Sequence, residues 1–367
     1  MASKKKAKYD RVLAIDLGNG LVKVRSITQE GRDYDLTLPS AWAYSKEVGE
    51  SVNHKVMDLD LFTIGDTEYV WGNEIVKVKG IKPTYGHENR YLTEAFKIMA
   101  QIAMAKAVHD LQITPQEKIL VVTGVPSTQT GTSREEDIVE AFLGTNDGLY
   151  QIGVNEDEVT FKVAHVEVMP QALSTVIGRY LSEDGGVEDA DYEEIKVAVI
   201  DIGGGTTDLD IVHGLRRQKG YHSIPKGFRD VYDTVRVAIK EEYPDHDVTD
   251  YELLAVLDET AERSKKGSVK TKQKYEYKPS RLKSAVDFTS ALNNGILELS
   301  IDIQQAIMSK WKDQTDLDEI LLVGGSAELF KDYIDRIVEG ITIPANSGNS
   351  NVEGYYRYGV YMLAGEQ

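Results

Sequence analysis

Residues 12–20 read Val-Leu-Ala-Ile-Asp-Leu-Gly-Asn-Gly, and residues 197–208 read Val-Ala-Val-Ile-Asp-Ile-Gly-Gly-Gly-Thr-Thr-Asp. In both segments an apolar run ends in an aspartate, Asp16 or Asp201, and a glycine turn follows. An alternating apolar stretch comes next, which predicts a second strand that folds back on the first. The chain therefore carries one strand–turn–strand design twice, and we expect two related halves.

The chemistry of this design favours the binding of a nucleotide. A glycine turn has no side chains in the way, so backbone N–H groups can surround an anion. An aspartate beside phosphate requires a cation between them, and Mg²⁺ accepts carboxylates, waters and phosphate oxygens together. We expect Asp16 and Asp201 to hold hydrated Mg²⁺, although solvated turn carboxylates would give the same pattern. The predicted phosphate-binding residues are Gly18, Asn19, Gly20, Lys23, Gly203, Gly204, Gly205 and Thr206.

Some of these residues have a purely structural alternative. Asn19 either donates to phosphate or simply tolerates the backbone of a turn. Lys23 either contacts phosphate or extends into solvent. Three consecutive glycines at 203–205 exceed what a turn needs, which favours close approach of a phosphate.

Composition narrows the class of protein. A chain of 367 residues is long enough for two domains, and 41% hydrophobic with 28% charged residues is typical of a globular protein. No apolar run reaches the ~18 residues of a membrane span, and residues 1–8 lack the apolar core of a secretory signal. The absence of cysteine excludes disulfides and thiolate catalysis and suits the cytoplasm.

The net charge of −18 predicts repulsion from nucleic acid and from anionic membranes. If the protein acts on DNA, we expect an adaptor to make the contact.

Hydrophobic periodicity predicts an α/β fold, in which strand hairpins followed by helical crossovers occur twice and two domains face each other across a nucleotide cleft. Domain I is expected to comprise residues 1–168 and 345–367, with a small β-rich insertion at about 40–90. Domain II is expected at 169–344, with an insertion at about 228–280. Less regular segments are predicted as a strand at Ile75–Val78, a polar hairpin at Ser268–Tyr277 and a long helical stretch from Arg281 to about Trp311.

Three motifs resemble the phosphate-1, phosphate-2 and adenosine motifs of the actin superfamily, in the same order. They are Asp16–Lys23, Asp201–Asp208 and Leu321–Ala327. The resemblance implies the actin/ribonuclease-H-like fold, binding of ATP or ADP with Mg²⁺, and an adenosine contact from Gly324, Gly325 and Ser326. GTP remains open as a substrate.

Within the superfamily, the segments Val121–Ser127, Val166–Gln171 and Asn351–Tyr355 resemble plasmid-partitioning actins of the ParM type. This resemblance implies a cytoplasmic ATPase that polymerises into filaments and moves plasmid DNA through a DNA-binding adaptor of the ParR type. It places hydrolysis on Gln171 together with Asp16 and Asp201. Where these relatives carry Glu, this chain has Gln171, which can orient a water molecule but cannot take its proton. Slow hydrolysis that rises on polymerisation is therefore expected.

Other functions stay open. A non-polymerising ATPase of the same fold, such as a chaperone, would share all three motifs, and so would a sugar or acetate kinase. A dinucleotide-binding oxidoreductase is disfavoured because Gly18-x-Gly20 lacks a third glycine and leads into a strand rather than a helix.

Overall fold

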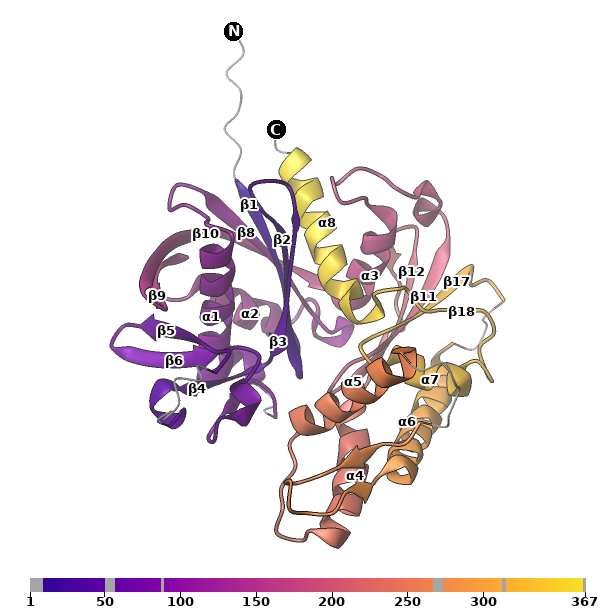
Figure 1. The fold of residues 1–367 in the computed structure, drawn as a ribbon. Helices are drawn as coiled ribbons and strands as arrows, with labels where there is room; N and C mark the ends of the chain where they lie inside the picture. Colours follow the sequence, from indigo (N-terminus) through magenta and orange to yellow (C-terminus); the bar gives the residue numbers. More distant parts are fainter. Residues whose placement is uncertain (1–8, 50–56, 87–88, 267–272, 312–314, 366–367) are drawn as a thin grey trace.

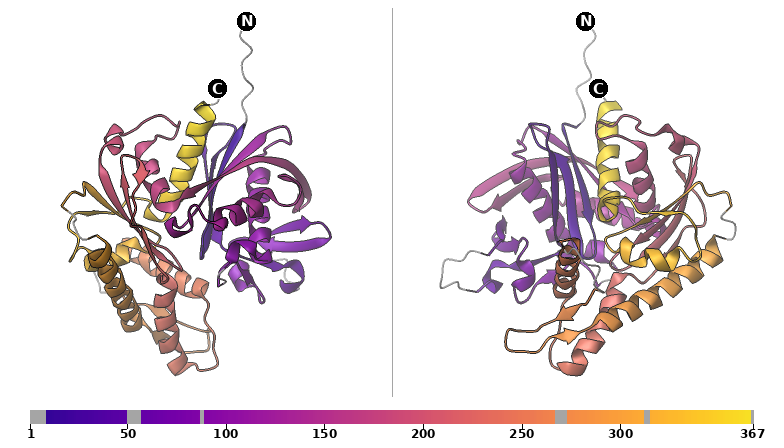
Figure 2. Two further views of the ribbon diagram at one scale, coloured as in Figure 1. Left: turned by 180° about the vertical axis from the view of Figure 1, so that it is seen from behind. Right: turned by 45° about the vertical axis from the view of Figure 1, so that its right-hand side comes forward.

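The computed structural model describes residues 9–49, 57–86, 89–266, 273–311 and 315–365, and within them the chain forms two lobes (Figure 1). The indigo and purple segments of Figure 1 build one lobe, and the pink and orange segments build the other. The C-terminal helix α8, Ser350–Gly365, returns between them, as Figure 2 shows from behind and in a view turned by 45°. Both ends of the chain therefore contribute to the first lobe and its border.

In the described residues the first sheet has ten strands in the order β3-β2-β1-β8-β10-β9-β5-β6-β4-β7. Towards one edge it contains the antiparallel hairpin β1–β2, with β8 parallel to β1 and β10 parallel to β8. Pairing of β5 with β9 attaches the short strands of the predicted insertion. The strands are β1 Arg11–Leu17, β2 Leu21–Ile27, β3 Asp33–Pro39, β4 Ala41–Tyr44, β5 Asp60–Ile64, β6 Thr67–Trp71, β7 Lys82–Pro83, β8 Lys118–Val125, β9 Leu149–Val154 and β10 Asp157–Pro170.

The second sheet repeats this arrangement of a hairpin followed by two parallel strands. The antiparallel hairpin β11–β12 is followed by β17 parallel to β11 and β18 parallel to β17. This repetition confirms the prediction of an α/β fold with two related halves. Its strands are β11 Lys196–Ile202, β12 Thr207–His213, β13 Arg216–Arg217, β14 His222–Ile224, β17 Glu319–Val323 and β18 Ile341–Thr342, and a separate pair consists of β15 Glu276–Tyr277 and β16 Val286–Asp287.

Helices cover both faces of the two sheets, and short 3₁₀ helices occupy several connections. The α-helices are α1 Glu94–Asp110, α2 Ser133–Leu143, α3 Gln171–Tyr180, α4 Phe228–Glu242, α5 Asp250–Lys266, α6 Thr289–Lys310 and α7 Ala327–Ile334, besides α8. The 3₁₀ helices are η1 Ser45–Glu47, η2 Ile75–Lys77, η3 Arg90–Leu92, η4 Ser127–Gln129, η5 Ala190–Glu193 and η6 Ser347–Asn349.

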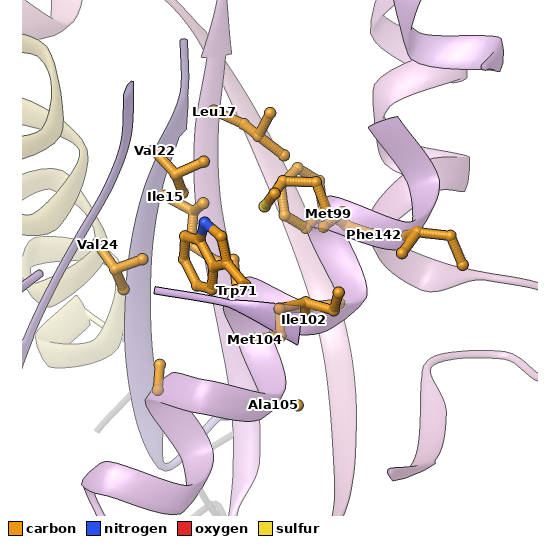
Figure 3. Close-up of a cluster of buried hydrophobic side chains, with 14 of the residues drawn as sticks. Ile15, Leu17, Val22, Val24, Trp71, Met99, Ile102, Met104, Ala105 and Phe142 are labelled. Carbon is orange, nitrogen blue, oxygen red and sulfur yellow. The ribbon is translucent and has the colours of Figure 1, made fainter. Parts of the chain in front are cut away.

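The alternation of side chains along each strand explains which helices cover each face of the sheets. Along β1, Leu13 and Ile15 point into the core shared with α1 and α2, whereas Val12 and Ala14 point towards α8. Figure 3 shows the first of these cores, in which Trp71 of the insertion packs close to the β1–β2 hairpin. In the second sheet, alternate residues of β11 face the α4–α6–α7 core or the α3 side. Helices α3 and α8 therefore lie between the two sheets.

Two predicted elements were wrong. Ile75–Val78 forms the 3₁₀ helix η2 rather than a strand, because Ile75 is buried at a turn that bonds back to Gly72. The helical stretch begins at Thr289 and not at Arg281, because Val286–Asp287 is the strand β16 that pairs with β15. Part of the predicted hairpin at 268–277 lies outside the described residues, and its described end pairs with β16.

Candidate nucleotide site

The two glycine turns have the same internal hydrogen bond. The backbone N–H of Gly18 donates to the carbonyl oxygen of Leu21 at 3.0 Å, and Gly203 donates to Thr206 at 2.9 Å. Each bond joins the first and last residues of the four-residue segment that connects the paired strands, Gly18–Leu21 and Gly203–Thr206. The repeated sequence therefore produces a repeated local structure.

These turns lie in contact across the border between the two sheets. A methyl group at Gly204 would lie 3.5 Å from Cβ of Asn19, and one at Gly205 would lie 2.8 Å from Asn19 Nδ2. The second of these distances is shorter than an ordinary contact, although the atom that it meets is the end of the Asn19 side chain, which can turn away; glycine at 205 thus favours the close approach of the two turns. The two aspartate–glycine hairpins thus face each other at one place.

Asp16 stands at the end of β1, opposite Lys23 on β2. It is buried, and its Oδ2 lies 3.6 Å from the Lys23 ammonium. Lys23 also donates to the carbonyl oxygen of Gly348, which belongs to the segment before α8. Lys23 therefore points into the site, and the solvent alternative is wrong; its predicted contact with phosphate stays a prediction.

Asp201 occupies the matching position at the end of β11 and is also buried. Its Oδ2 accepts a hydrogen bond from Asn351 Nδ2 at 2.9 Å, and Asn351 Oδ1 accepts one from Thr175 Oγ1 at 2.8 Å. Burial raises the pKa of Asp201; the Asn351 hydrogen bond lowers it, and the negative charge of Asp16 raises it further. The two predicted metal carboxylates are therefore close enough to interact.

Gln171 is the first residue of α3 and follows directly on β10. It is partly buried, and its carbonyl oxygen accepts a hydrogen bond from Ser174 Oγ at 2.6 Å. Thr175, one helical turn later, connects through Asn351 to Asp201. Gln171 thus begins the helix that borders the site, and its predicted role towards water stays a prediction.

Two more carboxylates on β12 extend the acidic region. Asp208 lies opposite Asp201 and accepts a hydrogen bond from Thr206 Oγ1 at 3.0 Å, so this hydroxyl already has a protein partner. Burial raises the pKa of Asp208 to about 7 and that of Asp210 to about 6. Both side chains are nearly inaccessible to solvent.

Two residues that sequence analysis missed hold the first turn. Ser40 Oγ donates to the carbonyl oxygen of Gly18 at 2.9 Å. Arg90 donates to Asn19 Oδ1 at 2.5 Å and to the carbonyl oxygens of Leu17 at 2.6 Å and Gly18 at 3.2 Å. Neither residue lies in a recognisable motif, so no local signal could have identified them.

The second turn is held by the start of α4. Phe228 N–H donates to the carbonyl oxygen of Gly203 at 3.0 Å, and Arg229 N–H donates to that of Gly204 at 2.9 Å. A methyl group at Gly227 would lie 2.5 Å from the Gly203 oxygen, so glycine is required for this contact. The first N–H groups of the helix therefore satisfy carbonyls of the turn.

The third motif, Leu321–Ala327, begins on β17, which pairs with β11 and so lies beside the second hairpin. Gly324 has φ of 106°, and a methyl group there would lie 2.2 Å from the carbonyl oxygen of Ile202. Its N–H donates to Ser347 at 3.1 Å, which joins the motif to the segment before α8. The Ser326 hydroxyl is buried and has no hydrogen-bond partner among the described residues.

The residues present fit a nucleotide with Mg²⁺. A methyl group at Gly20 or Gly325 would meet no atom within 4 Å, so there is open space beside both turns. The described residues contain no cluster of three histidine or acidic side chains in metal-binding geometry. Mg²⁺ does not need such a cluster, since it is usually held by one or two carboxylates, waters and substrate phosphates. Asp16 and Asp201 are the carboxylates that could hold it here.

Comparison with known proteins decides the family. The family model described as the actin-like proteins N-terminal domain matches residues 14–173, and the model of the Alp7A C-terminal domain matches residues 268–344. The chain is an actin-like protein. The resemblance to ParM-type proteins predicted from the sequence is confirmed by these matches together with solved ParM structures that share the fold.

Solved structures of actin-like proteins share this fold. The similar structures include apo pSK41 ParM (20% identity, 95% of this chain and 96% of that chain, TM-score 0.67) and a non-polymerisable quadruple mutant of pCBH ParM (18%, 95% and 98%, 0.72). Bacillus thuringiensis ParM with ATP is another (16%, 94% and 97%, 0.66). No curated protein sequence matches the chain significantly.

A membrane-crossing helix was not expected. Across the described parts of this actin-like chain, no helix combines the length and apolar character needed to span a bilayer.

Proposed function

We propose that this protein is an ATPase that binds Mg²⁺–ATP between its two glycine turns and polymerises into nucleotide-dependent filaments. The observation that carries the proposal is the contact of the turns at 18–20 and 203–205, with Asp16 and Asp201 behind them. Two buried carboxylates at one place repel each other and any phosphate, so the site gains stability from a bound divalent cation. Bacillus thuringiensis ParM with ATP supports the choice of nucleotide.

The roles follow from the positions of the side chains. Asp16 and Asp201 would hold the hydration shell of the metal, which when bound neutralises phosphate charge. Lys23, already directed at Asp16, would add a positive charge near the terminal phosphates. Gly324, Gly325 and Ser326 would contact the adenosine, where the Ser326 hydroxyl has no hydrogen-bond partner in the part of the chain that the structure describes.

Hydrolysis would involve Gln171 at the start of α3. Its amide can orient an attacking water molecule but has no useful basicity, so the isolated subunit should hydrolyse ATP slowly. Movement of α3 and α8 when the lobes close in a filament would bring this side chain nearer to the phosphates and raise the rate.

The cellular role is proposed as segregation of plasmid DNA through a DNA-binding adaptor of the ParR type in the cytoplasm. Similar structures include a pCBH ParM mutant described as non-polymerisable and a filament of Alp12, which support self-association as part of this role. A net charge of −18 disfavours direct binding to DNA, which is why an adaptor is required.

Sedimentation with parallel measurement of phosphate release tests the proposal. Pelleting that requires Mg²⁺–ATP, is weaker with ADP and is absent with EDTA would support a polymerising ATPase. Nucleotide hydrolysis without pelleting under any condition would refute the filament, and transfer of phosphate to a sugar or to acetate would identify a kinase instead.

A further inference from the structure

Arg90 connects the β-rich insertion to the first glycine turn. It lies on the short helix η3 between the insertion and α1, and its side chain reaches back over 71 positions to Asn19 Oδ1 at 2.5 Å. The second arm of the guanidinium donates to the carbonyl oxygens of Leu17 and Gly18. One side chain therefore holds three successive residues, the last of β1 and the first two of the turn.

The aromatic neighbours of Arg90 keep it in this position. Its guanidinium carbon lies 5.0 Å from the ring centre of Phe96 and 5.7 Å from that of Tyr91. Phe96 belongs to the first turn of α1 and is fully buried. A cation over aromatic rings is held in a fixed orientation, so Arg90 is a rigid part of the site.

Among the described residues, Arg90 is also a positive charge that forms no ion pair with a carboxylate. In the described chain no acidic side chain lies within ion-pair distance of it; its partners are carbonyl and amide oxygens, and its enclosed Nε has none. Burial lowers the pKa of Arg90, and the charges of Tyr91 and of the more distant Asp16 raise it. An enclosed cation of this kind is stabilised when an anion arrives nearby.

We propose that Arg90 is a positioning residue for polyphosphate: it fixes Asn19 and the turn in the conformation that accepts the phosphates, and its charge favours their binding. The inference rests on the proposed function, since it assumes that nucleotide phosphates bind at this turn. Through Arg90, the end of the insertion is hydrogen-bonded directly to the turn that would bind the phosphates. None of the Arg90 interactions among the described residues involves the segment 324–326, so we expect its effect on the phosphates and not on the adenosine.

Binding of Mg²⁺–ATP, Mg²⁺–ADP and AMP to the full-length variants Arg90→Met and Arg90→Lys tests this role by calorimetry and thermal shift. Arg90→Met should weaken ATP on the order of 10- to 100-fold, the loss expected when charge-assisted hydrogen bonds are removed, and should weaken AMP far less. Arg90→Lys, which keeps the charge but not the planar fork, should fall between Arg90→Met and the wild type.

Arg134→Met is the matched control, because Arg134 bonds Asn89 beside η3 but has no contact with the turn. It should bind ATP like the wild type. In a further variant, Arg90→Ala, added guanidinium at millimolar concentration should partly restore ATP binding, because it can occupy the place of the missing side chain. A variant that failed to bind because it was misfolded would not be rescued in this way.

The outcomes separate the two proposals. If the wild type shows no binding of Mg²⁺–ATP, the proposed function fails and this inference fails with it. If the wild type binds ATP and Arg90→Met binds it within twofold, or if Arg90→Met loses AMP and ATP in equal proportion, the proposed function stands and the role of Arg90 is refuted.

Discussion

The crossing of α3 and α8 between the two sheets leads to a sharp prediction for Gly354→Ala. A methyl group at Gly354 would lie 1.8 Å from the carbonyl oxygen of Ser174 and 2.4 Å from its carbonyl carbon. On the other helix, a methyl group at Gly178 would lie 3.2 Å from the Cα of Gly354. The helices therefore meet backbone to backbone, and each uses glycine at the crossing.

The loss of free energy of unfolding in Gly354→Ala depends on a backbone atom, the carbonyl oxygen of Ser174, which cannot rotate away from the new methyl group. The helices must separate until the new contact reaches about 3.4 Å, the start of ordinary van der Waals distances. Overpacking of a core typically costs about 1–3 kcal/mol, and we expect the upper end of that range here. Replacing a helical glycine by alanine returns up to about 1 kcal/mol, so the net loss should be about 2 kcal/mol.

The assay is urea unfolding, in which the midpoint falls if the free energy of unfolding falls while the slope stays the same. Gly365→Ala at the end of α8 is the control, because a methyl group there meets nothing within 4 Å. It should leave the midpoint unchanged or raise it slightly. A Gly354→Ala protein as stable as the wild type would show that α3 and α8 are not packed as described.

Three further predictions concern the site. Asp201→Ala should abolish ATP hydrolysis in a phosphate-release assay, and full turnover would make the second hairpin purely structural. Gln171→Ala should release phosphate well below the wild-type rate while keeping its affinity for ATP in calorimetry; equal rates would exclude Gln171 from the step. Burial raises the pKa of Asp208 from 3.8 to about 7, so the native state keeps a proton that the unfolded chain releases, and stability should fall as pH rises from about 4 to about 7. Asp208→Asn should make that fall smaller by on the order of 2–4 kcal/mol in chemical unfolding, and an unchanged pH profile would contradict the raised pKa.

The sequence predicted best where the signal was local. The turns at 18–20 and 203–205 follow from short runs in which apolar alternation, aspartate and glycine all indicate a strand hairpin, and the duplicated sheets follow from them. These predictions needed no knowledge of distant residues.

The failures have a different cause, since they depend on tertiary contacts. Val286–Asp287 forms a strand because Glu276–Tyr277 lies beside it, although the segment before Thr289 has helical periodicity. Arg90 belongs to the site only because the fold brings η3 against a turn far away in the chain. A single side chain of this kind leaves no periodic or motif-like trace in the sequence.

The most direct test of the central claim is a crystal structure of the protein with Mg²⁺ and a non-hydrolysable ATP analogue. We predict electron density for the phosphates between the turns at 18–20 and 203–205, with the metal on the side of Asp16 and Asp201. Density for the nucleotide at any other place on the molecule, with these two turns left free, would contradict the account.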